Sequence, residues 1–279
     1  MDVVVALDIG GTKVLAAAAG RDGVPRRTVK APTPASLAEG IHLLKSMVRD
    51  CAAGATIRAI GASIGGPLDW KQGVVSPLHQ PEWREVPLKA LLEKEFGCPF
   101  AVDVDTNVAA LGEWRARDRK PRRLLYLTIS TGMGGGFVVD GEIYRGANGE
   151  HPEVAHQSVG SSRDDRCECG ASGCLEALVS GNGIRRRYGK PGEQLTDGEW
   201  AEVGRDLGRG LRNLAAILAP DLIAVGGGVA IGAGEKLLAP ARQVAASSLK
   251  LVPLPPVERS ALGYDTALRG ALALALERA

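Results

Sequence analysis

Residues 3–19 read VVVALDIGGTKVLAAAA, and this pattern sets the architecture that the rest of the chain follows. The β-branched run at 3–7 predicts a buried strand, and the apolar run at 14–19 predicts a second one. Between them, the glycines of residues 8–13 predict a tight turn, so we expect the stretch to form a β-hairpin. Glycines let the backbone of such a turn approach a ligand closely, although an ordinary glycine hairpin explains these residues equally well.

The polar residues of this turn are of the types that bind phosphate and magnesium. The hydroxyl of Thr12 and the ammonium of Lys13 can bond and neutralise phosphate oxygens. Asp8, at the end of the first strand, is well placed to hold Mg²⁺ through water. No stretch fits the Walker pattern G-x-x-x-x-G-K-[ST], so the expected phosphate site is a hairpin turn. Its residues are Asp8, Gly10, Gly11, Thr12 and Lys13.

A second stretch, residues 124–139, repeats this order of strand, glycine turn and strand. It runs from LLYLTI through STGMGGG to FVV. Two copies of one hairpin indicate an internal duplication, with Thr131, Gly132 and Gly134 as the second phosphate-binding set. A Rossmann dinucleotide site is excluded, because Phe137 stands where the third glycine of G-x-G-x-x-G belongs.

Length and composition limit the class of protein. A chain of 279 residues predicts two α/β domains, and a net charge of +2 is too small to predict nucleic-acid binding. No apolar run approaches the roughly 20 residues of a membrane span, and no basic region opens the chain as in a signal peptide. We therefore expect a cytoplasmic protein that binds neither membranes nor nucleic acid. The expected domains are 1–118 plus 265–279, with the first turn, and 119–264, with the second turn and a cysteine cluster.

The cysteine cluster lies in the segment 149–176. Cys167, Cys169 and Cys174 form a C-x-C-x4-C array, and His156 precedes them. One nitrogen and three sulfur donors suit the tetrahedral coordination of a structural Zn²⁺. The same segment carries Glu153 and Glu176, which such a metal does not need. The segment is therefore expected to be a zinc-bound clip that also presents carboxylates to a ligand.

Two further positions each allow two interpretations. Asp105 follows the apolar run 100–104 and opens an alanine-rich helix, so it is either an N-cap or a general base at the carboxyl end of a strand. Gly227 and Gly228 end the strand-like run 220–226. They either form a tight strand–helix junction or let a nucleotide base or ribose lie across the backbone.

Together these motifs resemble the ROK family of sugar kinases and repressors. The resemblance covers nearly the whole chain and implies the actin/hexokinase-like (ribonuclease H-like) α/β fold, in which two duplicated domains enclose an ATP and sugar cleft. It is carried by DIGGTK at 8–13, STGMGGG at 130–136, the E-x-x-H of Glu153 and His156, the C-x-C-G-x-x-G-C-L-E of 167–176 and VGGG at 225–228.

The resemblance also implies roles for individual residues. Asp105 matches the catalytic aspartate that accepts the proton of the sugar 6-hydroxyl as this oxygen attacks the γ-phosphorus of ATP. His156 would bind structural zinc through one ring nitrogen and face the sugar with the other. The substrate-binding set would comprise Gly66, Asp103, Asn107, Glu153, His156 and Glu176.

The function implied is ATP-dependent phosphorylation of the 6-hydroxyl of a hexose or amino-hexose, with Mg²⁺ on the phosphates and a homodimer as the assembly. The alternative is a non-catalytic, sugar-sensing regulatory protein of the same family. Such a protein would be expected to lose Asp105 or a glycine turn first, and both are present. Repressors of the family carry a DNA-binding domain ahead of DIGGTK; only seven residues precede Asp8 here, so we expect a kinase.

The sequence departs from the glucokinase-like pattern at two places. Val104 stands where these members have the first asparagine of N-D-x-N, and Leu78 follows Pro77 where they have Pro-Asn. A buried sugar hydroxyl that loses an amide partner costs roughly 1–3 kcal/mol. One hypothesis is therefore a hexose altered near C3 or C4, such as the 3-amino sugar kanosamine. Asp103, His79 or Glu82 would then supply the new polar contacts. The alternative is that nearby residues compensate and glucose is still bound, and phosphorylation of a glucose-type sugar is the broader prediction.

Overall fold

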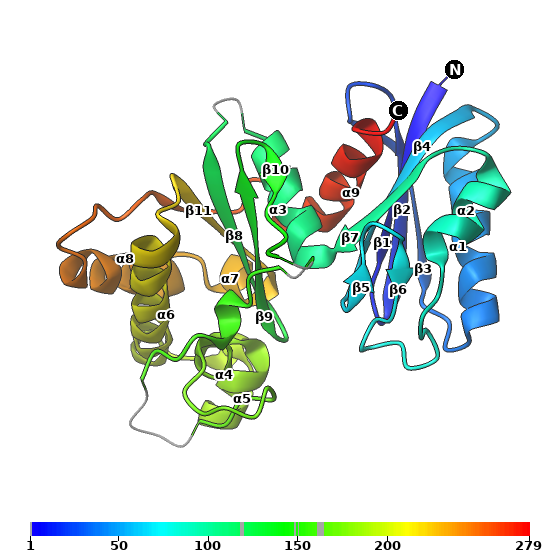
Figure 1. The fold of residues 1–279 in the computed structure, drawn as a ribbon. Helices are drawn as coiled ribbons and strands as arrows, with labels where there is room; N and C mark the ends of the chain where they lie inside the picture. The colour runs from blue at the N-terminus through cyan, green and yellow to red at the C-terminus, as the bar shows by residue number, and fades with distance from the viewer. Residues whose placement is uncertain (1, 118–119, 148, 150, 161–164) are drawn as a thin grey trace. The chain divides into compact units, whose positions relative to one another are not determined.

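A computed structural model describes residues 2–117, 120–147, 149, 151–160 and 165–279 (Figure 1). The chain divides into two compact units. Unit 1 contains residues 1–118, 145–150 and 265–279, and unit 2 contains 119–144 and 151–264. Residues 145–150, which the sequence division places in the second domain, thus group with unit 1. No helix among the described residues is long and apolar enough to cross a membrane.

Unit 1 is built on a five-stranded sheet in the order β3-β2-β1-β4-β7. The first three strands are antiparallel, whereas β4 is parallel to β1 and β7 is parallel to β4. Val5 and Leu7 are fully buried in this sheet, as the β-branched run predicts. The strands are β1 (Asp2–Ile9), β2 (Lys13–Ala19), β3 (Pro25–Pro32), β4 (Thr56–Ile64) and β7 (Phe100–Val104), with a small hairpin of β5 (Leu68–Asp69) and β6 (Val74–Val75) beside them.

The helices of unit 1 come from distant parts of the chain. They are α1 (Leu37–Ala52), α2 (Leu88–Phe96), α3 (Asp105–Arg115) and the C-terminal α9 (Thr266–Leu276). Helices α3 and α9 pack at close range, because a Cβ at Gly270 would collide with the carbonyl oxygen of Val108. This packing fixes α3, whose first residue is Asp105.

Unit 2 repeats the sheet of unit 1. Its order is β10-β9-β8-β11-β12, again an antiparallel hairpin followed by parallel strands. The predicted duplication therefore extends from the hairpins to both whole sheets. The strands are β8 (Arg123–Ile129), β9 (Met133–Val139), β10 (Glu142–Ile143), β11 (Leu222–Gly226) and β12 (Val257–Arg259).

In the sequence, most helices of unit 2 fall between β10 and β12. The longest, α6 (Asp197–Leu218), begins at a capping box in which Thr196 and Glu199 satisfy each other's backbone amides. The others are the 3₁₀ turn η1 (Val154–His156), α4 (Leu175–Val179), α5 (Gly181–Tyr188), α7 (Gly228–Ala233) and α8 (Glu235–Ser248).

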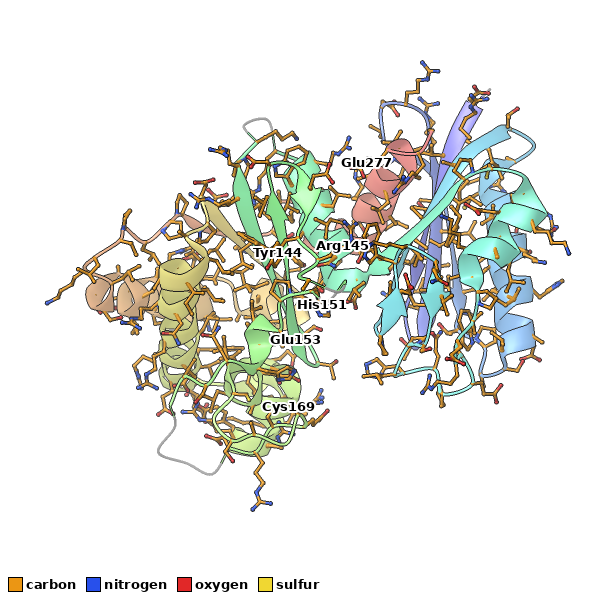
Figure 2. The ribbon with its side chains drawn as sticks, in the orientation of Figure 1. Tyr144, Arg145, His151, Glu153, Cys169 and Glu277 are labelled. Carbon is orange, nitrogen blue, oxygen red and sulfur yellow. The ribbon has the colours of Figure 1, made fainter. Side chains whose placement is uncertain are left out.

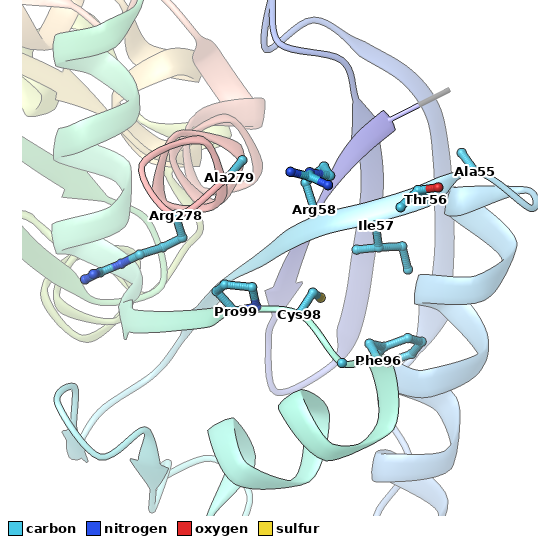
Figure 3. A pocket seen from close by; sticks show the side chains of 10 residues that line it. Ala55, Thr56, Ile57, Arg58, Phe96, Cys98, Pro99, Arg278 and Ala279 are labelled. Carbon is cyan, nitrogen blue, oxygen red and sulfur yellow. The ribbon is translucent and has the colours of Figure 1, made fainter.

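A hollow of about 610 Å³ lies on unit 1 (Figure 3). It is lined by residues 55–58 at the beginning of β4, by residues 96–99 and by the last two residues of the chain. Because Thr56 pairs with Asp2 and Ser63 with Asp8, this hollow is at the amino ends of the parallel strands. The glycine turn follows the carboxyl end of β1, so the hollow is not part of the expected site.

Candidate active site

The carboxyl ends of the parallel strands of unit 1 bring three polar residues together. Asp8 of β1 pairs with Ser63 of β4, and Ser63 pairs with Asp103 of β7. Asp105 follows two residues after Asp103, at the same edge of the sheet. Ligands of open α/β sheets bind at this edge, so the three strands position the carboxylates for chemistry.

Asp105 is exposed within an otherwise buried stretch of the chain. Among residues 102–113, all described, it is the one exposed residue. The N-cap position of α3 belongs to Val104, which makes no side-chain cap bond. Asp105 is the first helical residue, and its Oδ1 accepts a bond of 2.7 Å from the amide of Thr106. Its carboxylate is thus oriented by the helix yet accessible.

Asp8 is shielded beside the second carboxylate. Burial, followed by the charge of Asp105, raises the pKa of Asp8 to about 6, while a hydrogen bond from Ser63 and the charge of Lys13 oppose this rise. A cation beside these carboxylates would offset the repulsion between their charges. The edge can therefore hold Mg²⁺, for which oxygen ligands are the preferred type.

The first glycine turn presents its backbone to solvent. The amide of Gly10 donates to the carbonyl of Lys13 at 3.0 Å, and the hydroxyl of Thr33 donates to the carbonyl of Gly10 at 2.6 Å. Gly11, Thr12 and Lys13 are exposed. A Cβ at Gly11 would approach the side chain of His79 to 3.0 Å. The proline-bounded loop, residues 76–83 with Pro77 and Pro81, therefore lies against this turn.

Two expected sugar contacts are buried instead of facing solvent. Asp103 is 2% exposed and Asn107 is 0% exposed. Oδ1 of Asp103 accepts bonds from the amide of Val104 at 2.7 Å and from Nδ2 of Asn107 at 2.9 Å. Its Oδ2 accepts a bond of 2.6 Å from Nε of Arg145. Both carboxylate oxygens of Asp103 accept hydrogen bonds, so this buried side chain stabilises the junction between β7 and α3.

Gly66 lies beside Val104 and the proline-bounded loop. A Cβ at Gly66 would be 3.7 Å from Cγ2 of Val104. The amide of Leu78 donates to the carbonyl of Gly66 at 3.1 Å. Among the residues expected to give new polar contacts, His79 and Glu82 are both exposed, and a carboxylate oxygen of Glu82 accepts a bond from the amide of Leu37.

The second glycine turn is held by the beginning of α5. The amides of Gly181 and Asn182 donate to the carbonyls of Ser130 at 2.7 Å and Thr131 at 3.0 Å. A Cβ at Gly132 would be 3.3 Å from Oε1 of Glu176, so this turn adjoins the carboxylates of the cysteine segment. Gly134 pairs with Thr128 across the hairpin.

His156 faces two sets of groups with its two ring nitrogens. Nδ1 is 3.5 Å from the sulfur of Cys167. Nε2 is 3.7 Å from a carboxylate oxygen of Glu153 and 3.7 Å from one of Glu176. Burial raises the pKa of Glu176, and the nearby charge of His156 opposes this effect. The Nδ1 edge of the imidazole thus faces a cysteine sulfur, and the Nε2 edge faces two carboxylates that could accept hydrogen bonds from hydroxyl groups.

The donor set of His156 and the three cysteines fits a tetrahedral metal ion. The four donor atoms lie within 4.8 Å of one another, and the sulfurs of Cys169 and Cys174 are 3.6 Å apart. Ligands at zinc–sulfur distance on a tetrahedron are about 3.7 Å apart, which agrees with these separations. Burial and the neighbouring sulfurs raise the pKa of Cys174 to about 12, so three thiolates need a cation to coexist.

One further residue of this group carries no sequence signal. Nε2 of His151 is 3.5 Å from Oε1 of Glu153, so the Glu153 carboxylate lies between two imidazoles (Figure 2). Neither its spacing nor its neighbours separate His151 from an ordinary loop histidine. Only the fold of the segment brings it to Glu153.

The glycines after β11 serve a tight junction and leave an exposed backbone. Gly227 has φ +87°, and a Cβ there would collide with the backbone of Ile129, so the junction requires glycine. Gly228 is exposed and begins α7. The structure therefore supports the junction interpretation for Gly227, and the nucleotide role of both glycines stays a prediction.

The ROK family profile matches residues 4–278. The chain belongs to the ROK family. A glucokinase from Streptomyces coelicolor is 29% identical over 316 aligned positions, which cover 99% of this chain and 98% of that protein. Other relatives of this ROK protein are named as fructokinases, an N-acetylmannosamine kinase and a xylose repressor.

Solved structures of ROK kinases superpose on nearly the whole chain. The ROK hexokinase from Thermus thermophilus has a TM-score of 0.82 at 32% identity, covering 98% of this chain and 97% of that one. A ROK family glucokinase from Streptomyces griseus, in complex with glucose and AMPPNP, has a TM-score of 0.81 at 27% identity, covering 99% of each chain. The predicted actin/hexokinase-like α/β fold is therefore confirmed.

Proposed function

We propose that this ROK protein is an ATP-dependent sugar kinase that phosphorylates the 6-hydroxyl of a hexose. The observation that carries the proposal is Asp105, an exposed carboxylate on a buried strand–helix junction, at the edge where open sheets bind ligands. The names of its relatives, glucokinase above all, support the same class of reaction. Asp105→Asn should abolish sugar-dependent ADP release.

In the proposed reaction, the carboxylate of Asp105 accepts the proton of the sugar hydroxyl. The hydroxyl oxygen forms a bond to the γ-phosphorus while the bond from this phosphorus to the bridging oxygen of ADP breaks. General-base action of this kind contributes roughly 10²–10⁴ in rate. The remaining work is to position the reactants and to stabilise negative charge on the phosphates.

The two glycine turns are proposed to bind the phosphates. The first supplies the ammonium of Lys13, the hydroxyl of Thr12 and the accessible backbone of Gly10 and Gly11. Asp8 would hold Mg²⁺, which neutralises charge on the transferred group when it is bound. The second set, together with the glycines after β11, would hold the rest of the nucleotide. It comprises Thr131, Gly132, Gly134, Gly227 and Gly228.

The sugar is proposed to be held by the carboxylates around His156. Glu153 and Glu176 accept bonds from sugar hydroxyls, and Nε2 of His156 faces the same side. A structural Zn²⁺ on His156, Cys167, Cys169 and Cys174 would fix the orientation and tautomer of the imidazole. Gly66 and Asn107 belong to the expected sugar set of unit 1. Since Asn107 is buried, its contribution would be to hold the junction that carries Asp105.

The identity of the sugar depends on the surroundings of Val104. Its side chain is 8% exposed and offers no hydrogen bond where an asparagine is expected from the family pattern. Both oxygens of Asp103 are occupied, so Asp103 is not available to bind the ammonium of a 3-amino sugar. His79, exposed beside Gly11, and the exposed Glu82 are the remaining candidates. The proposal therefore retains glucose and a hexose altered near C3 or C4 as the substrates to compare.

A panel of sugars in a coupled ADP-release assay tests this choice. We expect a higher kcat/KM for a hexose altered at C3 or C4 than for glucose, and Val104→Asn should shift the preference toward glucose by about tenfold. A higher kcat/KM for glucose than for every altered sugar would contradict the altered-sugar hypothesis. Wild-type protein that binds sugar but releases no ADP would instead support a sugar-sensing regulator. Homodimer formation, also proposed, is checked by light scattering.

A further inference from the structure

We propose that Arg145 is a positioning residue that pins the segment 145–149 to the carboxyl end of β7 and thereby orients Asp105. This inference deepens the proposed kinase function and rests on it. Its basis is a group of contacts inside unit 1 that joins residues from three separate parts of the chain. None of the roles inferred from the sequence involves Arg145.

The centre of this group is a buried ion pair. Nε of Arg145 donates to Oδ2 of Asp103 at 2.6 Å, and the two side chains are 18% and 3% exposed. The other carboxylate oxygen, Oδ1, bonds the amide of Val104 and the side chain of Asn107. Asp103 thus links Arg145 to the residues on both sides of Asp105. A displacement of Arg145 would be transmitted to the first turn of α3.

Trp70 holds Arg145 from the opposite side. The guanidinium carbon of Arg145 is 4.1 Å from the centroid of the Trp70 ring, a cation–π contact. Trp70 itself lies on the turn after β5, where Oδ1 of Asp69 accepts bonds from the amides of Lys71 and Gln72. The guanidinium is therefore held between a carboxylate and an aromatic face, each on a fixed element.

The same ring contacts the end of the segment. A Cβ at Gly149 would be 3.1 Å from Cδ1 of Trp70, and Gly149 has φ +100°. The amide of Gly149 donates to the carbonyl of Arg145 at 2.9 Å, which links the two ends of the segment. Four residues after Gly149 the chain reaches Glu153, a proposed sugar ligand. Arg145 and Gly149 therefore both contact Trp70 within unit 1.

Positioning of this kind has a kinetic signature. A misplacement of about 1 Å at a reacting group lowers the rate about 100-fold, even when the cause lies outside the chemistry. The planar guanidinium satisfies both the carboxylate and the ring, whereas the ammonium of lysine is a point charge. A residue that only stabilises the fold would instead lower the melting temperature without a matching loss of turnover.

The test compares three variants with a matched control. Arg145→Met removes the charge and keeps an apolar stem over Trp70; Arg145→Lys keeps the charge. Arg145→Met combined with Asp103→Asn removes both charges, so that no buried charge is unpaired. The control is Arg115→Met, because Arg115 at the far end of α3 pairs with Glu277 at 2.7 Å on the surface.

We measure kcat, the KM for sugar, the KM for ATP and the melting temperature of each protein. We expect Arg145→Met to lower kcat/KM for sugar about 100-fold and Arg145→Lys about tenfold, with the KM for ATP changed less than about threefold. The double variant should regain melting temperature but keep a low kcat/KM. Arg115→Met should stay within about twofold of wild type in kcat/KM.

A double variant with kcat/KM within about threefold of wild type would overturn the inference, because Arg145 would then only neutralise Asp103. A loss of kcat/KM in Arg115→Met equal to that in Arg145→Met would also overturn the inference. If Arg145→Met does not fold, the kcat/KM values of Arg145→Lys and of the double variant test the inference by the same criteria. Wild-type protein without sugar-dependent ADP release refutes the proposed function and this inference together, whereas active wild-type and double-variant proteins refute the inference alone.

Discussion

The two glycine hairpins of this protein share a backbone but differ in charge. The turn of unit 1 contains Asp8 and Lys13, whereas residues 130–136 of unit 2 contain no charged side chain. Each turn is tied down by a neighbouring segment, through Thr33 in unit 1 and through the amides that open α5 in unit 2. The duplication has therefore preserved a backbone cradle in both units.

The sheet edges beside the hairpins also differ in charge. In unit 1 the ends of β1 and β7 carry Asp8 and Asp103, and Asp105 comes directly after β7. The matching edge of unit 2 pairs Thr128 with Gly226 and has no carboxylate at these positions. The proposed general base and the proposed Mg²⁺ ligand, Asp105 and Asp8, therefore both belong to unit 1. Unit 2 has instead gained the cysteine segment, with His156, Glu153 and Glu176.

Loss of the base in unit 1 gives the largest expected effect. Asp105→Asn should lower kcat by about 10³-fold or more, because the amide cannot accept the hydroxyl proton. Coupled ADP release measures this change. The control is Asp22→Asn, which removes an exposed carboxylate of the same unit that pairs with Arg26. Turnover in Asp105→Asn close to that of the control would contradict the proposed role of Asp105 as the general base.

Loss of the metal site in unit 2 should affect sugar binding more than the chemical step. Cys174 is 1% exposed, and Cys174→Ser removes one of the four donors. We expect the variant to lose its zinc, to raise the KM for sugar about tenfold or more, and to melt at a lower temperature. Metal analysis, kinetics and calorimetry measure the three effects. Cys98→Ser, at a buried cysteine outside the cluster, should retain zinc; full activity of Cys174→Ser without zinc would refute the structural role.

The smallest expected effect is a pH dependence from Asp8. Its pKa of about 6 exceeds the ordinary value of 3.8, so the native state binds more protons than the unfolded state between these values. The free energy of unfolding that Asp8 contributes therefore falls as the pH rises from about 4 to 6, by up to about 3 kcal/mol. Kinase activity should rise over the upper part of this range, as the carboxylate that we propose to hold Mg²⁺ forms.

Asp8→Asn removes this titration. The difference in melting temperature between wild type and Asp8→Asn should change in favour of the variant as the pH rises from 4 to 6, and it should be constant above pH 7. A difference that stays constant across the whole range would show that Asp8 keeps an ordinary pKa.

Features encoded by local patterns were predictable from the sequence. The hairpins follow from β-branched runs that flank glycine turns, and their repetition indicates the duplicated fold. The four donors near residue 170 follow from cysteine spacing, because a short segment brings them together in any compact conformation. The position of Asp105 at the beginning of a helix after a buried strand was predictable in the same way, whereas its role as general base comes from the family resemblance and stays a prediction.

Features that depend on long-range register were not predictable. Asp103 and Arg145 are 42 positions apart, and they meet only because β7 pairs with β4 while the segment 145–149 returns to unit 1. The burial of Asn107, which the family resemblance places in the sugar site, also depends on this register, and its sugar contact stays a prediction. His151 shows the same limit, since its contact with Glu153 depends on the conformation of an irregular segment.

The division of labour between the units is tested most directly by the dissociation constant of the preferred sugar, measured by calorimetry for Asp105→Asn and Glu176→Gln. We expect Asp105→Asn to bind sugar within about threefold of wild type although turnover is lost. Glu176→Gln should bind about tenfold or more weakly, because it loses a charged hydrogen-bond acceptor. Unchanged binding in Glu176→Gln, together with weakened binding in Asp105→Asn, would contradict the account.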